Sequence, residues 1–304
     1  MLRSMFSGVS GLRNHQVKMD VIGNNIANVN TVGYKMSRTT FQEMYSQTLR
    51  SASAATGTAG GTNPQQVGLG VSTAAIDVVH EGGAMQSTDR ALDFAISGDG
   101  FFVVQQGDSR YYTRAGNLYL DDDGFLVTAN GLFVQGVSLL LDADVPAGVR
   151  GTMKIMTQAA LDAVSETTLA ASGNTNTYLG RILIPEGKFT SFAVDKRGLI
   201  TGIDSNDNLV PIGQILTATF VNPPGLTRLG SNLYEKSNNS GTPQIHRPSA
   251  GGAGELISGS LEMSNVDLSR EFTDMIITQR GFQANSRVIT VSDTLLEELI
   301  NLKR

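Results

Sequence analysis

A run of acidic residues is the first place where this chain could do chemistry. Residues 121–124 read Asp-Asp-Asp-Gly, and closely spaced carboxylates before a glycine are typical of a calcium-binding loop. An EF-hand built on them needs an acidic residue in place of Tyr119 and a glutamate in place of Asn130. Because the spacing fails, the run predicts an acidic hairpin turn instead.

The histidines offer no better metal site. His15, His80 and His246 are the only ones, and they fall in three distant regions without a neighbour at metal-ligand spacing. The chain has no cysteine, which excludes disulfides, thiolate ligands and a cysteine nucleophile. We therefore expect no metal and no cofactor.

The glycine-rich turns do not form a phosphate-binding loop. The Gly-x-Gly sequences at residues 68–70 and 98–100 lack the following helix and the lysine that a phosphate cradle requires. No Gly-x-Ser-x-Gly elbow precedes a helix, and no pair of acids is marked for glycoside chemistry. We predict that the chain has no catalytic residues and is not an enzyme.

Composition excludes two further classes of partner. The formal net charge of −5 argues against binding to nucleic acid or to an anionic membrane, since both need a basic face. No run of eighteen apolar residues is present, so we expect no membrane insertion. Residues 1–8 have no continuous apolar stretch, so we expect no cleaved signal peptide. The 34 glycines predict many turns between short strands.

An apolar repeat at each end of the chain is the strongest pattern. Near the front, apolar residues recur every seven positions with one more beside them: Met5, Val9, Leu12, Met19 and Ile26. Near the back, the same repeat is longer: Leu268, Met275, Phe282, Ile289 and Leu296. An adjoining row adds Val288, Leu295 and Leu302. Such a repeat predicts a helix that packs lengthwise on another helix.

These thirteen residues are the candidate assembly interface. A plain alternative is the core of an ordinary two-helix hairpin. A single helix pair, however, buries only the inner row, so the row that contains Leu295 would stay in water unless other subunits cover it. Each large apolar side chain contributes ~1.5–3 kcal/mol when it is buried. Self-association is the simplest outcome.

The expected helices have recognisable ends. The first helix should run over about residues 3–28, interrupted by Gly8, Gly11 and Gly23, each costing roughly 1 kcal/mol relative to alanine. It should therefore rely on its neighbours. An asparagine-rich run at residues 24–30 should end it, because asparagine tolerates left-handed backbone and bonds to nearby main chain. The second helix should begin after residue 265, with Asp267 or Ser269 as its cap.

Between the helices the sequence predicts strands and turns. Two runs flank a turn at residues 98–100, three more lie within residues 111–136, and a short helix could lie within residues 152–169. Later strands are expected at residues 180–184, 191–195, 199–203 and 214–221.

The whole pattern predicts an α+β fold in which N- and C-terminal helices pair as a coiled-coil-like inner layer. A discontinuous, mainly-β domain lies between them. The expected parts are a terminal helical domain (1–33 and 266–304), an extended connector (34–75), a β-rich domain (76–136 and 181–265) and a small insert or outer subdomain (137–180).

Five stretches resemble one family. The first, residues 24–35, reads Asn-Asn-Ile-Ala-Asn-Val-Asn-Thr-Val-Gly-Tyr-Lys. Two others are Gly-Asp-Gly-Phe-Phe at residues 98–102 and Tyr-Thr-Arg-Ala-Gly-Asn at residues 112–117. The last two lie at residues 220–234 and 259–268. Five motifs in this order are similar to the axial proteins of the bacterial flagellar rod and hook.

The resemblance implies a role in assembly and no catalysis. Terminal helices of this family form concentric inner layers around a channel, and the β-domains form the wall. Residues 51–63, 66–71 and the insert favour a subunit of the bendable, torque-transmitting hook; a distal rod protein is the alternative. The resemblance also marks a junction between helix and connector: Asn24, Asn25, Asn28, Gly33 and Tyr34.

Partners and location follow from the same resemblance. It implies a helical homopolymer that meets rod and hook–filament junction proteins, the hook cap and the type III export machinery. It also implies an extracellular location in the flagellum, reached without a cleaved signal. From another class, a secreted β-rich adhesin that oligomerises through its terminal helices remains a rival hypothesis.

Overall fold

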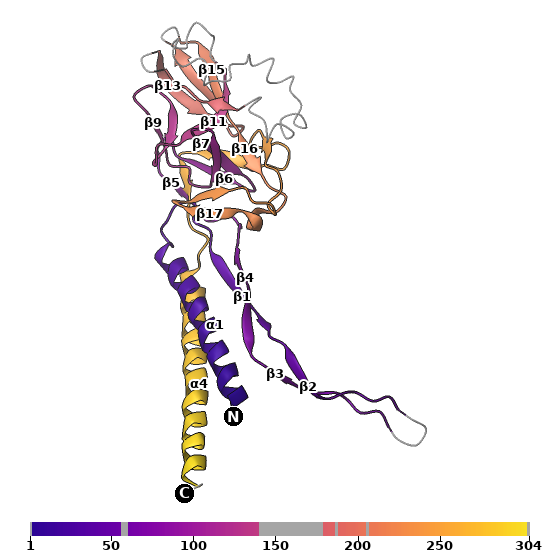
Figure 1. Cartoon of the computed structure of the whole chain (residues 1–304). Coiled ribbons are helices and arrows are strands. Elements are labelled where there is room, and N and C mark those ends of the chain that lie inside the picture. Colours follow the sequence, from indigo (N-terminus) through magenta and orange to yellow (C-terminus); the bar gives the residue numbers. More distant parts are fainter. Residues whose placement is uncertain (1, 56–59, 140–178, 186–187, 205–206, 303–304) are drawn as a thin grey trace. The chain divides into compact units, whose positions relative to one another are not determined.

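The chain forms two compact units in a computed structural model that describes residues 2–55, 60–139, 179–185, 188–204 and 207–302 (Figure 1). The first unit contains residues 1–29, 36–79 and 266–304, and the second contains residues 30–35 and 80–265. The chain is therefore mixed helix and strand, with helices at both ends and a β domain between them. None of the described helices is long and apolar enough to cross a membrane.

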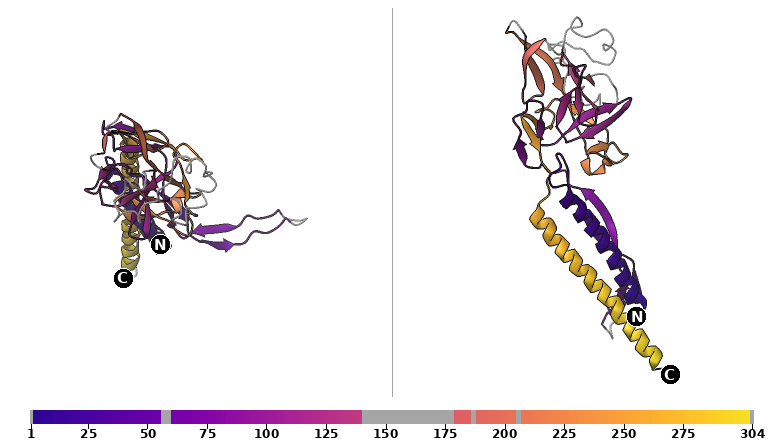
Figure 2. Two further views of the ribbon diagram at one scale, coloured as in Figure 1. Left: turned by 90° about the horizontal axis from the view of Figure 1, so that it is seen from above. Right: turned by 90° about the vertical axis from the view of Figure 1, so that its left-hand side faces the viewer.

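Two helices make up most of the first unit. Helix α1 spans Leu2–Ala27 and α4 spans Leu268–Asn301, and they lie side by side (Figures 1 and 2). The expected cap of α4 is confirmed, because the carboxylate of Asp267 accepts hydrogen bonds from the backbone amides of Ser269 and Arg270 at 2.9 and 3.4 Å. At the end of α1, the amide of Asn28 still bonds back to the carbonyl oxygen of Asn24 at 3.2 Å.

The segment predicted as an extended connector is a ribbon of paired strands. Strand β1 (Ser37–Glu43) pairs antiparallel with β4 (Val71–Val78), and β2 (Ser46–Arg50) pairs antiparallel with β3 (Gln65–Gly68). All side chains of β2 and β3 are exposed, so this part of the ribbon contributes no core. The β1–β4 part of the ribbon is fixed to α1, where the Asn14 side chain donates to the carbonyl oxygen of Val71 at 2.6 Å.

In its described residues, the second unit contains short antiparallel strands and a turn of 3₁₀ helix, η4 (Pro223–Gly225). The main path of its largest sheet runs β13-β14-β15-β11-β7-β8-β18-β17. The strands of that path and their side branches are β7 (Phe101–Gln106), β8 (Ser109–Thr113), β9 (Leu118–Leu120), β10 (Leu126–Thr128), β11 (Phe133–Ser138), β12 (Gly180–Arg181), β13 (Phe189–Val194), β14 (Leu199–Asp204), β15 (Leu209–Ile215), β16 (Thr217–Thr219), β17 (Thr227–Gly230), β18 (Leu233–Glu235) and β19 (Gln244–His246).

Two smaller pairings lie outside this largest sheet in the described part of the second unit. Strand β6 (Phe94–Ser97) pairs with β20 (Glu255–Ser258), and β5 (Met85–Ser87) pairs with β21 (Ser260–Glu262). Both pairings join a segment near the start of the unit to one near its end. The chain therefore leaves this unit close to where it entered.

Strand β7 divides the core of the second unit into two clusters. Phe102 and Val104 pack into one cluster, and Phe101 and Val103 pack into the other. Side chains alternate between the two faces of a strand, so an uninterrupted apolar run is buried on both faces. This explains why residues 101–104 read Phe-Phe-Val-Val without a polar residue.

Most turns fall where the sequence placed them. The acidic run forms the turn between β9 and β10, where the amide of Gly124 donates to the carbonyl oxygen of Asp121 at 2.8 Å. The single strand expected at residues 214–221 is wrong, because the chain there divides between β15 and β16, which lie in different parts of the sheet. The helix considered within residues 152–169 lies outside the described residues.

Candidate functional site

The seam between α1 and α4 is lined by small and polar residues at its deepest positions. The buried residues of α4 are Glu271, Thr278 and Ser292, and half-buried Asn285 lies at the remaining seven-residue step between them. Burial raises the pKa of Glu271, and a hydrogen bond with Asn25 of α1 opposes the rise. The hydroxyls of Thr278 and Ser292 donate to carbonyl oxygens of α4 itself, at 2.6 and 2.7 Å. The bond between Glu271 and Asn25 is therefore the polar contact here that depends on the register of the two helices.

Helix α1 meets this polar row with glycines. A Cβ atom at Gly11 would lie 2.7 Å from the side-chain amide nitrogen of Asn285, and one at Gly8 would lie 3.5 Å from Cγ1 of Ile289. Further along, Lys18 pairs with Asp274 at 3.6 Å. Gly11, one of the three glycines that weaken α1 on its own, therefore lets α4 approach closely, whereas a Cβ at Gly8 would make only ordinary van der Waals contact.

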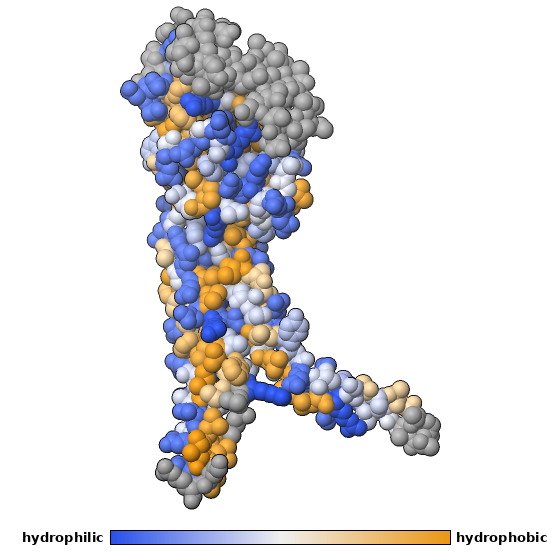
Figure 3. Space-filling view, in the orientation of Figure 1, coloured by the Kyte–Doolittle hydropathy of each residue, from blue (hydrophilic) through white to orange (hydrophobic). Residues whose placement is uncertain are grey.

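The predicted apolar residues flank this seam. Eight are half-buried: Met5, Leu12, Met19, Ile26, Met275, Phe282, Ile289 and Leu296. Five are exposed: Val9, Leu268, Val288, Leu295 and Leu302. Figure 3 shows hydrophobic side chains gathered along the helices, down to the end of α4. The helix pair thus leaves a large apolar surface in water.

The seam predicts opposite effects for two glycine-to-leucine changes. Gly11→Leu should separate the helices, because its side chain must occupy the space of Asn285. Gly23→Leu should stabilise the pair by about 1 kcal/mol, since nothing lies within 4 Å of its Cβ position and leucine favours helix. Amide hydrogen exchange across α4 measures both. Equal exchange rates in the two variants would contradict the close approach at Gly11.

In the first unit, the junction asparagines fasten the end of α1 to the ribbon. The side-chain amide of buried Asn25 donates to the carbonyl oxygen of Ser37 at 2.8 Å, and its oxygen accepts from the Ser37 amide at 3.0 Å. Asn28, half-buried, donates to the side-chain oxygen of exposed Asn24 at 2.7 Å. Asn25 thus pairs with β1 as a neighbouring strand would.

In the second unit, Gly33 and Tyr34 are both buried. Gly33 has φ of 68°, and a Cβ there would lie 2.6 Å from the amide nitrogen of Ala115, so the position needs glycine. The guanidinium of Arg228 lies 4.9 Å from the centre of the Tyr34 ring and donates to the carbonyl oxygen of Lys35.

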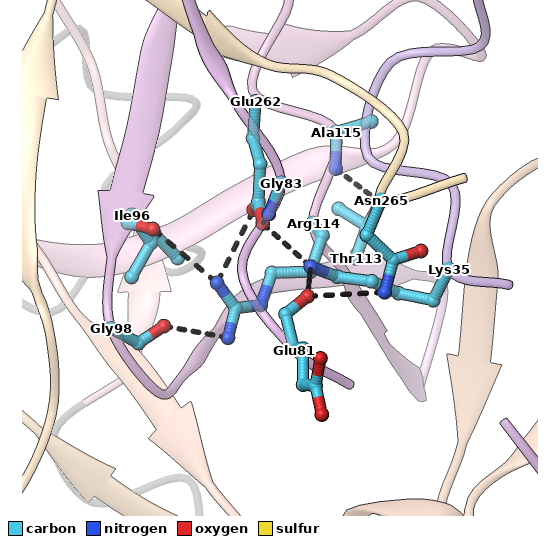
Figure 4. Close-up of polar contacts among 10 residues, drawn as sticks. All are labelled: Lys35, Glu81, Gly83, Ile96, Gly98, Thr113, Arg114, Ala115, Glu262 and Asn265. Atoms are coloured by element: carbon cyan, nitrogen blue, oxygen red, sulfur yellow. Dashed lines mark hydrogen bonds and ion pairs between the residues drawn. The ribbon is translucent and has the colours of Figure 1, made fainter. Parts of the chain in front are cut away.

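A buried ionic cluster next to these residues was not predicted from the sequence (Figure 4). Lys35, Arg114 and Glu262 are each at most 1% exposed. The Glu262 carboxylate accepts from Nζ of Lys35 at 2.5 Å and from Nη1 of Arg114 at 3.2 Å. The sequence held one signal for this cluster, because each of the three charged residues lies inside one of the family-like stretches. A charge that is buried needs a partner of opposite sign, and the stretches supply both signs.

Charges of this cluster act on His80, whose ring lies 5.5 Å from the rings of Phe101 and Tyr234. Burial, and then the positive charges of Arg114, Lys35 and Arg228, lower the pKa of His80 to about 4. Burial also lowers the pKa of Lys35, while Glu262 opposes that shift. The site therefore favours a neutral imidazole beside two buried cations.

The depressed pKa of His80 predicts acid sensitivity of the second unit. Unfolded His80 takes up its proton near pH 6.5 and the folded residue near pH 4, so stability is complete above pH 6.5 and falls as pH drops towards 4. The expected loss is on the order of 2 kcal/mol. Denaturant unfolding between pH 4 and 7 measures it, with His80→Leu as comparison. A variant that keeps the full pH slope would contradict this origin.

Metal chemistry has no evident place in the described part of the chain, where no three histidine, aspartate or glutamate side chains come together as a possible ion site. The geometry presents a pair of helices with many exposed apolar side chains and a β unit that contains a buried ionic cluster. These features are typical of a structural subunit.

Comparisons with known proteins agree with that class. Three family models match: "Flagella basal body rod protein" over residues 5–35, "Flagellar hook protein FlgE/F/G D1 domain" over residues 95–202, and "Flagellar basal body rod FlgEFG protein C-terminal" over residues 257–302. Lys35, Arg114 and Glu262 each fall within a different one of them.

Curated relatives extend over the whole chain. The flagellar basal-body rod protein FlgG of Bacillus subtilis is 48% identical, with all of both chains covered. The flagellar hook protein FlgE of Borreliella burgdorferi is 33% identical, again with all of both chains covered. The chain belongs to the flagellar hook and basal-body rod protein family, which is a family of structural proteins.

A solved structure, that of the Helicobacter pylori flagellar hook protein FlgE2, is also similar. It covers 59% of this chain with a TM-score of 0.38 and 11% identity, which is too low to support an argument about the fold. Family membership favours a flagellar subunit over the secreted adhesin considered above.

Proposed function

We propose that this protein is a subunit that assembles helically into the flagellar hook through its terminal helices. The observation that carries the proposal is the number of large apolar side chains that α4 leaves exposed along its length. Its exposed large apolar residues include Phe272, Ile276, Val291, Leu295 and Leu299. A soluble chain rarely leaves so many along one helix unless another molecule covers them.

The predicted interface residues then have two roles in the proposed polymer. Half-buried residues such as Leu12 and Ile289 support the pair within one subunit. Exposed residues such as Leu295 and Leu302 meet other copies, and the helices form a coiled-coil-like layer inside a β wall. Burial of five such side chains is worth on the order of 10 kcal/mol, before the cost of association is subtracted.

The position along the flagellar axis is the finer part of the proposal. Hook proteins of Borreliella burgdorferi and Treponema pallidum match the entire chain at 33% and 32% identity. As hook subunit, the protein would link rod to filament, transmit torque, and meet junction proteins and the hook cap. It would reach the cell exterior through the type III export machinery, without a cleaved signal.

A distal rod protein is the second candidate, and a specific observation favours it. The alignment with the Bacillus subtilis rod protein spans 305 positions, against 304 residues in this chain, whereas the alignment with the Borreliella hook protein spans 441. The Bacillus subtilis rod protein is also 48% identical to this chain, although the rod and hook proteins of Borreliella burgdorferi are both 33% identical to it.

Electron microscopy of the purified chain at high concentration tests the proposal. Bent tubes with a central channel are the expected result. Straight, inflexible tubes would favour the rod protein. Monodisperse particles at all concentrations would overturn self-assembly itself.

A further inference from the structure

The chain passes between its two units four times, at residues 29–30, 35–36, 79–80 and 265–266. The residues of the second unit that lead into these crossings form three segments: residues 30–35, 80–84 and 262–265. Every covalent path between the units therefore runs through these three segments.

Glu262 bonds to both of the other segments. One carboxylate oxygen accepts from Nζ of Lys35 at 2.5 Å and from the backbone amide of Gly83 at 3.0 Å. Its carbonyl oxygen accepts from the amide of Gly33 at 2.8 Å. A single residue thus holds the three segments together from its side chain and its main chain.

The segments also bond to one another around this residue (Figure 4). The carbonyl oxygen of Glu81 accepts from Nζ of Lys35 at 2.6 Å and from the side-chain amide of Asn265 at 3.3 Å. A Cβ at Gly83 would lie 2.0 Å from the carbonyl oxygen of Met263, so main chains approach closely there. Removal of one of these side chains therefore leaves hydrogen-bonding groups of the other segments without a partner.

Arg114 attaches the group to the body of the sheet. Besides its bond to Glu262, it donates to the carbonyl oxygens of Gly98 at 2.8 Å and Ile96 at 3.4 Å. Ile96 belongs to β6, which is in the core. Two buried cations, Lys35 and Arg114, share the one buried carboxylate of Glu262, so loss of that carboxylate leaves both uncompensated.

We propose that Glu262 is the centre of a clamp that joins the three segments, so that they loosen together and not one by one. The clamp consists of Gly33, Lys35, Glu81, Gly83, Arg114, Glu262 and Asn265. Its structural action is independent of polymerisation. One consequence rests on the proposed function: in a torque-transmitting polymer, force between the units would reach the sheet through this clamp.

The test is amide hydrogen exchange, followed by mass spectrometry, on the full chain as a dilute monomer. Glu262→Gln should raise exchange about tenfold or more in residues 30–35, 80–84 and 262–265 together, while β7 and β8 stay protected. Glu255→Gln is the matched control, because Glu255 lies in the same unit but pairs with Lys196 on the surface at 3.6 Å. It should change none of the three segments.

Lys35→Gln is the second variant, since it leaves Glu262 paired one to one with Arg114 and so disturbs folding less. It should loosen all three segments by a smaller factor. A change confined to residues 30–35, or no change in either variant, would overturn the clamp. Because the monomer is measured, that result would leave tube formation by the unaltered chain unaffected, and the two proposals can fail separately.

Discussion

Leu295→Asp is expected to abolish polymerisation of the purified protein while leaving the monomer folded. Leu295 is 46% exposed and belongs to the outer row with Val288 and Leu302, so the folded chain tolerates a charge there. In a polymer that covers this row, the same carboxylate would be buried without a partner, which costs several kcal/mol at every interface. Repeated along a helical polymer, that cost prevents growth.

Thr294→Asp is the matched control, because it adds the same charge to the preceding residue, which is polar and exposed. Sedimentation velocity and electron microscopy at equal concentrations compare the two variants. Normal tubes from Leu295→Asp would show that the outer row is not an interface. Leu12→Asp and Ile289→Asp should also block assembly, but these residues are half-buried, so both changes would disturb the helix pair as well.

Gly116→Ala is expected to lower the free energy of unfolding of the second unit strongly. A Cβ at this position would lie 1.7 Å from the carbonyl oxygen of Phe94, whose amide also donates to the carbonyl oxygen of Gly116 at 2.9 Å. The obstacle is main chain of a core strand, so it cannot turn aside as a side chain would. We expect a loss of at least about 3 kcal/mol.

Gly82→Ala serves as the control, because nothing lies within 4 Å of its Cβ position. Urea unfolding followed by intrinsic tyrosine fluorescence reports on the second unit in both variants. The control should unfold at the urea concentration of the unaltered chain. A Gly116→Ala protein with that same midpoint would mean that β6 and residue 116 are farther apart than the structure has them.

Local patterns in the sequence were enough to predict the helices and most strands. A seven-residue apolar repeat is a property of neighbouring residues, so the terminal helices follow from it directly. The cap at Asp267 follows from the residue type at the start of the second helix. The turns at residues 98–100 and 121–124 follow from glycine and aspartate chemistry in the same way. The division between β15 and β16 could not be predicted in this way, because the end of a strand depends on the strands with which it pairs.

The face that each helix presents to the other could not be predicted from the repeat. Apolar rows marked both helices, but the deepest contacts join Gly11 with Asn285 and Asn25 with Glu271. A repeat locates a stripe on one helix and does not say how closely a second helix approaches it. Close approach needs small residues, whose importance becomes visible only when the partner is in place.

The sequence by itself determined the kind of protein, through terminal helices and the family-like stretches that contain Lys35, Arg114 and Glu262. Only the tertiary structure decided that these three side chains meet, although Glu262 is separated from Lys35 by 227 positions and from Arg114 by 148. Periodicity and turn chemistry act over a few residues, so they can be read along the chain. The pairing of buried charges depends on which distant segments the folded backbone brings together.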